Sequence, residues 1–350
     1  MPFTHNPTAQ LATNYYFQTN LTYPTRMKTR FIFLILCALC SVIAFAQSEK
    51  FTEHDVAIPL YEDSLRGKLL VPTTTSKPTS VVLIIAGSGP TNMDGNTIVA
   101  GGMSNNSLKM LAEALAQNGI ASLRYDKRGI GTSADININE SELRFEHYVT
   151  DAMAWIDFLQ HYKDWSSTTI IGHSEGALIG MIAANRHQAV TSYVSLAGTG
   201  RPAYKVIEEQ LAQQPQEVRQ QVAMFNNTLR LGITISEVPA YLANLYRKSV
   251  QPYLISWFKY DPQNEISKLQ IPTLIIQGET DIQVKSLDAE LLTKAAQQPQ
   301  QVLIPEMNHV LKHCASLNQQ EQLLTYSNPT QPLHPTLIPT ITNFIKIHCK

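Results

Sequence analysis

The feature that most constrains the fold of this chain is a repeated alternation of short, largely apolar runs with longer helical patterns. The first run, Val81 to Ile85, has five apolar residues and is followed by Gly87-Ser88-Gly89-Pro90. A run of this length without polar alternation indicates a strand buried on both faces. Runs of the same kind recur at 120–125, 168–171, 192–196, 272–276 and 301–304.

Helical patterns fill the intervals between these runs, at 108–117, 147–161, 177–185, 286–296 and 336–347. Two strands that we expect to pair antiparallel, 53–60 and 65–71, precede the first run. Strands that alternate with helices form crossover units, and these place parallel strands in one sheet. The pattern therefore predicts an α/β fold with a mainly parallel central sheet flanked by helices.

One interval, 201–268, lacks a convincing strand and instead shows helical patterns at 203–213, 216–229, 238–248 and 253–258. It is far longer than the connections of about 2–6 residues usual in such folds. We expect an inserted helical lid over one edge of the sheet, within a core formed by residues 51–200 and 269–350. A surface insertion without a role in binding is the alternative.

The N-terminal 46 residues have a different character. Phe31 to Ala46 is almost wholly apolar and follows the basic stretch Met27 to Arg30. At 16 residues the segment is shorter than the roughly 20 that span a bilayer, and Ala44 and Ala46 suit cleavage. We expect a signal peptide over about 27–46, cut before Gln47, with translation starting at Met27. The mature protein would then be exported, periplasmic or secreted. A retained anchor is the alternative; lipoprotein processing is disfavoured because Leu precedes each cysteine of this segment.

Charge and cysteine content exclude several classes of function. The chain has 27 Lys and Arg against 28 Asp and Glu, a formal charge of −1, and loss of the first 46 residues removes three positive charges and no negative ones. A chain with this charge balance has no excess of positive charge with which to bind a phosphate backbone, so nucleic acid is not an expected partner. Of the four cysteines, Cys314 and Cys349 would remain after signal cleavage, either as one disulfide bridge or as two free thiols. The spacing of the cysteines does not indicate a metal site.

The chemistry begins at Gly172-His173-Ser174-Glu175-Gly176, which follows a β-branched strand and precedes a helix rich in small residues. This is the context of a nucleophile elbow, in which a sharp turn exposes the serine hydroxyl at the end of a strand. Glycines on both sides allow close approach of the backbone. We predict that Ser174 is the nucleophile.

A serine nucleophile needs a histidine base and an acid, which follow it in that order in folds with this elbow. Asp281 comes after the run 272–276, and His309 comes after the run 301–304, each in a loop at the expected edge of the sheet. We predict that these two complete a triad, with Glu279 as the rival acid. Other histidines are placed less favourably: His173, His313, His334 and His348.

A tetrahedral oxyanion is stabilised by backbone N–H groups from the residue after the nucleophile and from an earlier strand–helix loop. The sequence predicts that Glu175 provides the first, its side chain being incidental. Ser88 provides the second, with Gly89 as the alternative. A phosphate-binding loop is excluded here, because no Gly-Lys-Ser/Thr motif follows and the third glycine of a dinucleotide fingerprint is missing.

Together these residues resemble the α/β-hydrolases, and specifically the serine-aminopeptidase-like branch that includes monoglyceride lipases and many bacterial esterases. The resemblance extends from about Phe51 to the C-terminus. It rests on the motifs above and on Leu123-Arg124-Tyr125-Asp126-Lys127-Arg128-Gly129-Ile130-Gly131-Thr132-Ser133. Asn92-Met93 departs from the charged pair common before Asp94-Gly95 in that branch. Asp126 and Arg128 are expected to brace the sheet edge.

The resemblance implies a serine hydrolase that acts through an acyl-enzyme, without a metal or other cofactor, on a small-molecule ester or acyl substrate. We expect a carboxylesterase, because the Gly-Gly-Pro-Gly sequence of proline iminopeptidase relatives is absent. Two alternatives stay open: an aminopeptidase, in which Glu208-Glu209 binds the substrate amine, and a catalytically silent binding scaffold. The sequence predicts neither the acyl-chain length nor the oligomeric state.

Overall fold

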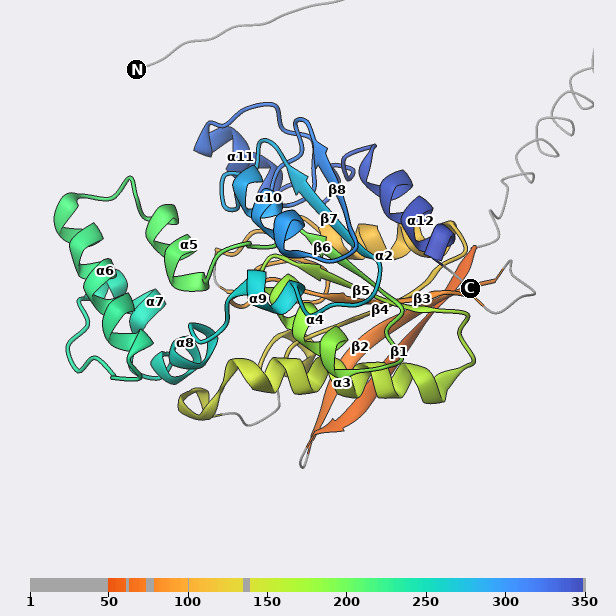
Figure 1. Cartoon of the computed structure of the whole chain (residues 1–350), viewed down its shortest axis with the longest axis horizontal. Coiled ribbons are helices and arrows are strands. Elements are labelled where there is room, and N and C mark those ends of the chain that lie inside the picture. The colour runs from red at the N-terminus through yellow and green to blue at the C-terminus, as the bar shows by residue number, and fades with distance from the viewer. Residues whose placement is uncertain (1–49, 61–62, 74–78, 100, 135–138, 349–350) are drawn as a thin grey trace, which may run out of the picture. The chain divides into compact units, whose positions relative to one another are not determined.

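The computed structural model describes residues 50–60, 63–73, 79–99, 101–134 and 139–348 (Figure 1). The predicted signal peptide and Cys349 lie outside these residues. Cys314 is buried, with a free thiol. Among the described residues, no helix combines the length and apolar character needed to cross a membrane.

An eight-stranded sheet forms the centre of this part of the chain, in the order β1-β2-β4-β3-β5-β6-β7-β8. β2 pairs antiparallel with β1 and β4, and the strands from β4 to β8 run parallel. The strands are β1 (Phe51–Leu60), β2 (Asp63–Pro72), β3 (Val81–Ile85), β4 (Ala121–Tyr125), β5 (Thr168–His173), β6 (Ser192–Leu196), β7 (Thr273–Gly278) and β8 (Pro299–Ile304). The predicted α/β fold with a mainly parallel sheet is confirmed.

Helices cover both faces of the sheet (Figure 1). The helices outside the insertion are α2 (Ser107–Gln117), α3 (Phe145–Tyr162), α4 (Glu175–Arg186), α10 (Ser286–Ala295), α11 (Gln319–Tyr326) and α12 (Leu337–His348), with short 3-10 helices η1 (Gly131–Ser133) and η2 (Glu140–Glu142). The sequence did not indicate α11, whose residues are mostly polar. Its first turn is capped by Asn318, whose side chain accepts hydrogen bonds from the backbone N–H groups of Gln320 and Glu321.

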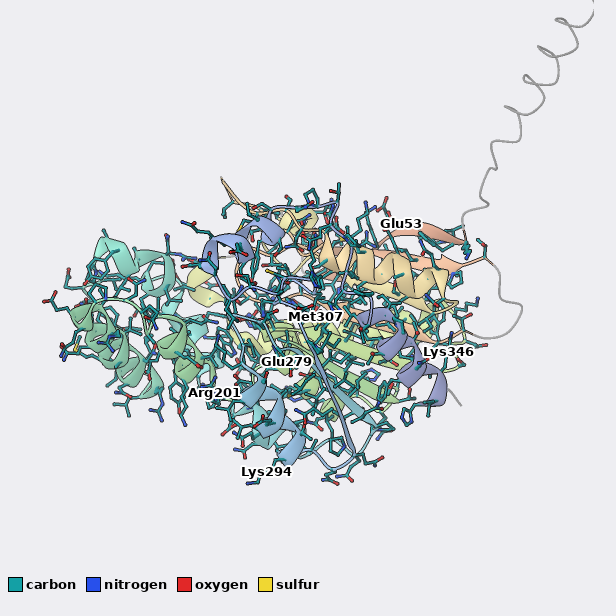
Figure 2. The ribbon with its side chains drawn as sticks, turned by 90° about the horizontal axis from the view of Figure 1, so that it is seen from above. Glu53, Arg201, Glu279, Lys294, Met307 and Lys346 are labelled. Carbon is teal, nitrogen blue, oxygen red and sulfur yellow. The ribbon has the colours of Figure 1, made fainter. Side chains whose placement is uncertain are left out.

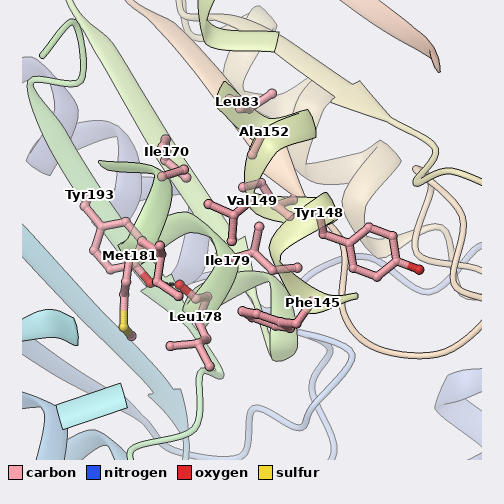
Figure 3. Close-up of a cluster of buried hydrophobic side chains, with 14 of the residues drawn as sticks. Leu83, Phe145, Tyr148, Val149, Ala152, Ile170, Leu178, Ile179, Met181 and Tyr193 are labelled. Carbon is pink, nitrogen blue, oxygen red and sulfur yellow. Dashed lines mark hydrogen bonds between the residues drawn. The ribbon is translucent and has the colours of Figure 1, made fainter. Parts of the chain in front are cut away.

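The strand β3 shows why the apolar runs carry no polar alternation. Val81, Leu83 and Ile85 pack on one face with α3 and α4, and Val82 and Ile84 pack on the other with α2 and α12. Successive side chains of a strand point to opposite faces, so a sheet covered on both sides needs apolar residues throughout. Figure 3 shows the first of these layers, with Leu83 beside side chains of α3 and α4.

Between β6 and β7 the described chain is helical. This insertion comprises α5 (Ala203–Gln210), α6 (Gln216–Arg230), η3 (Ala240–Leu242), α7 (Ala243–Tyr246), α8 (Gln251–Trp257) and α9 (Pro262–Ile266). Figure 1 shows α5 to α8 gathered to one side of the sheet. The helix predicted over 238–248 is broken, because Pro239 starts a 3-10 turn and the chain leaves the helix again at Arg247.

Aromatic packing holds the insertion against α3. Tyr253 and Trp257 of α8 contact Phe145, whose backbone N–H also donates to the hydroxyl of Ser256 over 2.8 Å. Large aromatic rings bury much apolar surface for little loss of conformational freedom. The α8 end of the insertion is therefore part of the same core as the sheet.

Candidate active site

The loops that carry the predicted site residues leave the sheet at one edge. In the parallel part of the sheet, Ile85 of β3 lies opposite Gly172 of β5, and Gly278 of β7 lies opposite Ile304 of β8. Residues that follow these strands therefore emerge at the same level, at the carboxyl ends of the strands. Active sites of open parallel sheets form at this edge.

Ser174 stands in the turn between β5 and α4. Its backbone has φ 56° and ψ −121°, an unusual region for a residue with a side chain. A hydrogen bond of 3.0 Å from its N–H to the carbonyl of Leu196 in β6 holds the turn in place. The elbow geometry expected from the sequence is therefore present.

The two glycines of the pentapeptide are required by packing. A Cβ atom on Gly172 would lie 2.2 Å from the carbonyl oxygen of Gly176, and one on Gly176 would lie 2.3 Å from the carbonyl oxygen of Ile85. Both distances are far below van der Waals contact with backbone atoms that cannot move aside. The elbow thus forms only because α4 packs directly on β3 and β5 without intervening side chains.

The loops of the predicted acid and base interlock. Gly278 packs so closely against the carbonyl of Met307 that a Cβ atom there would lie 1.9 Å from it, and the N–H of Thr280 donates to the same carbonyl over 3.3 Å. This contact brings Nδ1 of His309 to 2.8 Å from Oδ2 of Asp281, both side chains being buried.

Glu279, the rival acid, is exposed (Figure 2), and no hydrogen bond joins it to His309 among the described residues. The structure thus brings Asp281, and not Glu279, to the histidine.

Asp281 is held as a carboxylate by its surroundings. Burial raises the pKa of its carboxyl group, but the charge and hydrogen bond of His309 and the backbone N–H groups of Val284 and Gln283 outweigh that effect and leave the pKa below its ordinary value. The two backbone donors reach Oδ1 at 3.0 and 2.7 Å. An ionised Asp281 accepts the Nδ1 proton of His309, which leaves Nε2 of that ring as the free base.

His173 connects the elbow to the histidine loop. Its Nε2 atom lies 2.9 Å from the carbonyl oxygen of His309, and the centroids of the two rings are 4.8 Å apart. Burial, and next the charge of His309, lower the pKa of His173 to about 3. A neutral His173 donates its Nε2 proton to that carbonyl.

The structure shows no hydrogen bond between Ser174 and His309 among the described residues. Such bonds are often long before a substrate binds. The two residues are connected here through His173, which precedes Ser174 in the chain.

The predicted oxyanion loop lies against the nucleophile. A Cβ atom on Gly87 would be 3.1 Å from Cβ of Ser174, so the peptide that joins Gly87 to Ser88 borders the elbow. Ser88 and Gly89 are exposed, and Gly89 adopts a φ of 69°. On the other side, the N–H of Glu175 is the first of helix α4 and needs no partner within the helix. Both predicted donors therefore flank Ser174.

The sequence did not indicate the role of the Glu175 side chain, which we expected to be incidental. It is buried, forms an ion pair of 3.0 Å with the ammonium group of Lys127, and accepts a hydrogen bond from Tyr253 of α8. The only local signal was Lys127 itself, a lysine between the two residues expected to brace the sheet edge. Lys127 and Tyr253 lie 48 and 78 positions from Glu175 in the chain, so spacing could not reveal these contacts.

The residues expected to brace the sheet edge do so. Asp126 accepts hydrogen bonds from the backbone N–H groups of Met93 (2.6 Å) and Thr132 (2.7 Å), and thereby ties two loops to β4. Arg128 pairs with buried Asp151 of α3, with Nε 2.7 Å from the carboxylate.

Of the other histidines, His313 pairs with Glu306 on the surface and stacks on His334, and His348 contacts Phe344 at the end of α12. No group of three or more metal-binding side chains occurs among the described residues.

The chain is similar to known esterases and peptidases in sequence and in structure. A family model of serine aminopeptidases of the S33 class matches residues 94–249. Esterase EstD of Thermotoga maritima is 29% identical over an alignment of 280 residues that covers 76% of this chain, and the chain spans 62% of the length of EstD.

Solved structures with the same architecture include Est1E of Butyrivibrio proteoclasticus, with ferulic acid bound, at a TM-score of 0.55 and 17% identity. Another is proline iminopeptidase of Mycobacterium smegmatis, at a TM-score of 0.53 and 14% identity. Each match covers 84% of this chain and 98% of the other.

The chain thus has the α/β-hydrolase fold. In sequence it is similar to serine aminopeptidases over residues 94–249 and to the esterase EstD.

Proposed function

We propose that this protein is a serine hydrolase that cleaves carboxylic esters of small molecules through an acyl-enzyme intermediate. The observation that carries the proposal is the placement of Ser174 on a strained elbow at the sheet edge where His309 is hydrogen-bonded to the buried carboxylate of Asp281. The similarity to the esterase EstD supports the same activity.

The chemistry follows from the residue types. His309 takes the proton of the Ser174 hydroxyl through Nε2, while Asp281 fixes the tautomer and stabilises the imidazolium. The serine oxygen then attacks the acyl carbonyl, and the N–H groups of Ser88 and Glu175 stabilise the oxyanion. The protonated histidine releases the alcohol, and water, activated by the same histidine, frees the acyl group.

An aminopeptidase is the second candidate, because the family model that matches describes serine aminopeptidases. Glu208 and Glu209 of α5, the sequence's candidates for binding a substrate amine, argue against it. Glu208 accepts a hydrogen bond from Asn226 at 3.1 Å, and Glu209 is paired with Arg201. Since Arg201 already compensates the charge of Glu209, we favour the ester substrate.

Fluorophosphonate labelling tests the nucleophile. We expect wild-type protein to be labelled and Ser174→Ala to be neither labelled nor active, while the matched variant Ser141→Ala, at an exposed serine of η2, behaves as wild type. A wild-type protein that does not react would leave the catalytically silent scaffold as the better account.

A pair of variants tests the acid. Asp281→Asn should lower kcat by about 10³- to 10⁴-fold, because the amide stabilises the wrong tautomer of His309. The control is Glu279→Gln, which should change kcat by less than about twofold, since Glu279 makes no contact with His309 within the described part of the chain. The opposite ranking would reassign the acid.

Substrate class is tested by comparing p-nitrophenyl acetate and butyrate with aminoacyl p-nitroanilides. Faster turnover of the anilides would favour the aminopeptidase.

We further propose that the protein is exported, and this proposal rests on the sequence of residues 27–46 alone. We also propose that helices α5 to α8 act as a lid. N-terminal sequencing of the mature protein tests cleavage of the signal peptide, and a mature chain that still carries Phe31 to Ala46 would contradict cleavage.

A further inference from the structure

Lys127, which follows β4, has an unusual environment for a lysine. Its side chain is buried, and its ammonium group donates to the carbonyl oxygen of Gly87 at 2.6 Å. It also lies 3.0 Å from the carboxylate of Glu175 and 4.9 Å from the ring centroid of Tyr148. Burying an ammonium group costs several kcal/mol unless charge and hydrogen bonds compensate it. The three contacts provide that compensation beside the nucleophile elbow.

The contact with Gly87 controls the orientation of the next N–H group. A peptide unit is planar and almost always trans, so its carbonyl and its N–H point in opposite directions. The carbonyl of Gly87 and the N–H of Ser88 belong to one such unit. A cation that fixes the carbonyl therefore fixes the direction of the N–H, and by drawing electron density toward the oxygen it makes the N–H a stronger donor.

The other partner of Lys127 links the ion pair to the second donor. Glu175 contributes its backbone N–H at the start of α4, and its carboxylate compensates the charge of Lys127. The second oxygen of that carboxylate accepts from the hydroxyl of Tyr253 in α8. One buried pair thus connects the loop after β3, the first residue of α4 and a helix of the insertion.

We propose that Lys127 is a positioning residue for the oxyanion hole: it holds the Gly87 carbonyl so that the Ser88 N–H points at the developing oxyanion, and Glu175 maintains its charge and place. The inference rests on the proposed function. Because the oxyanion exists in the tetrahedral state and not in the bound ester, loss of the pair lowers kcat and leaves KM nearly unchanged.

The chain contains a matched control for a purely structural ion pair. Arg128 is the next residue, is also buried and also pairs with a buried carboxylate, that of Asp151. Its guanidinium pairs with Asp151 of α3, with Nε 2.7 Å from the carboxylate. Removing both charges in each pair avoids leaving a single buried charge, which would destabilise the fold. The variants to compare are therefore Lys127→Met/Glu175→Gln and Arg128→Met/Asp151→Asn.

The assay measures kcat and KM for p-nitrophenyl butyrate and the inhibition constant of an alkyl trifluoromethyl ketone. This ketone forms a tetrahedral adduct with the serine and carries its own oxyanion. For Lys127→Met/Glu175→Gln, we expect kcat and ketone affinity each to fall about 10- to 100-fold, less than the 10²- to 10³-fold loss of a whole donor. KM should stay within about twofold. For Arg128→Met/Asp151→Asn, all three values should stay within about threefold, whatever the change in urea stability.

Two results overturn the inference. In the first, wild-type protein is active and the Lys127 variant keeps its kcat and ketone affinity. In the second, both double variants lose activity in proportion to their loss of stability, so that the pair is structural only. A wild-type protein that neither hydrolyses esters nor reacts with a fluorophosphonate is a different outcome, because it rejects the proposed function and with it this inference.

Discussion

Replacing His173 by glutamine should remove part of the acid sensitivity of the fold. The imidazole of His173 is buried and neutral, with a pKa of about 3 against an ordinary value of 6.5. Below pH 6.5 the unfolded chain therefore binds a proton at this residue, whereas the folded chain does not. The contribution of His173 to the unfolding free energy is present above pH 6.5 and is lost as the pH falls toward 3. Glutamine is the matched replacement, because its amide can donate to the His309 carbonyl and does not titrate.

The size of the effect follows from the unfolded pKa. At pH 5, the protonated form of an unfolded histidine with a pKa of 6.5 exceeds the neutral form about 30-fold. This lowers the unfolding free energy by about 2 kcal/mol relative to pH 7.5. The result depends little on the folded pKa, provided that it lies well below 5.

Urea unfolding, followed by tryptophan fluorescence at both pH values, measures the effect. The fall in unfolding free energy between pH 7.5 and pH 5 should be about 2 kcal/mol smaller in His173→Gln than in wild type. The variant His313→Gln, at a side chain that is 57% exposed, controls for the loss of a histidine. If wild type and His173→Gln lose the same free energy, the burial argument is wrong.

Further predictions concern packing and charge. Gly172→Ala should destabilise the protein by about 3 kcal/mol and reduce fluorophosphonate labelling, because its Cβ would meet the carbonyl of Gly176 at 2.2 Å. Thermal unfolding checks the first effect. Arg201→Met should cost about 3 kcal/mol in urea unfolding, since it leaves the buried carboxylate of Asp288 without its cation, 2.7 Å away. Lys268→Met, which removes an exposed ion pair, should cost less than about 1 kcal/mol, and equal losses would contradict this reasoning.

The core of the fold was predictable because its signals are local. The buried parallel strands are short and largely apolar, and the predicted ranges 81–85 and 192–196 coincide with β3 and β6 residue for residue. The ends of other elements differ from the predicted ones by at most three residues, since termini are set by caps and turns rather than by apolar content. Helix α11 was not predicted, because polar residues dominate it and its cap at Asn318 is a weak signal alone.

The candidate site likewise contains residues that local sequence predicted and contacts that it did not. Ser174, Asp281 and His309 were indicated by motifs and by their position after strands, which need only local sequence. The pair of Lys127 with Glu175 was not predicted, since 48 residues separate its members and nothing in either segment specifies the other. The lowered pKa of His173 was likewise not predicted, because it depends on burial and on the neighbouring loop of His309.

The hydrogen bond from Tyr253 to Glu175 has a consequence for how proteins of this architecture exchange their parts. Insertions between β6 and β7 look like separable units, which recombination or an engineer would replace to change substrate range. Here the hydroxyl of Tyr253, in the insertion, donates a hydrogen bond to Glu175, the residue after Ser174. A transplanted insertion without a hydrogen-bond donor at that place would leave a buried carboxylate oxygen unsatisfied, so exchange at this position is restricted to segments that bring such a donor.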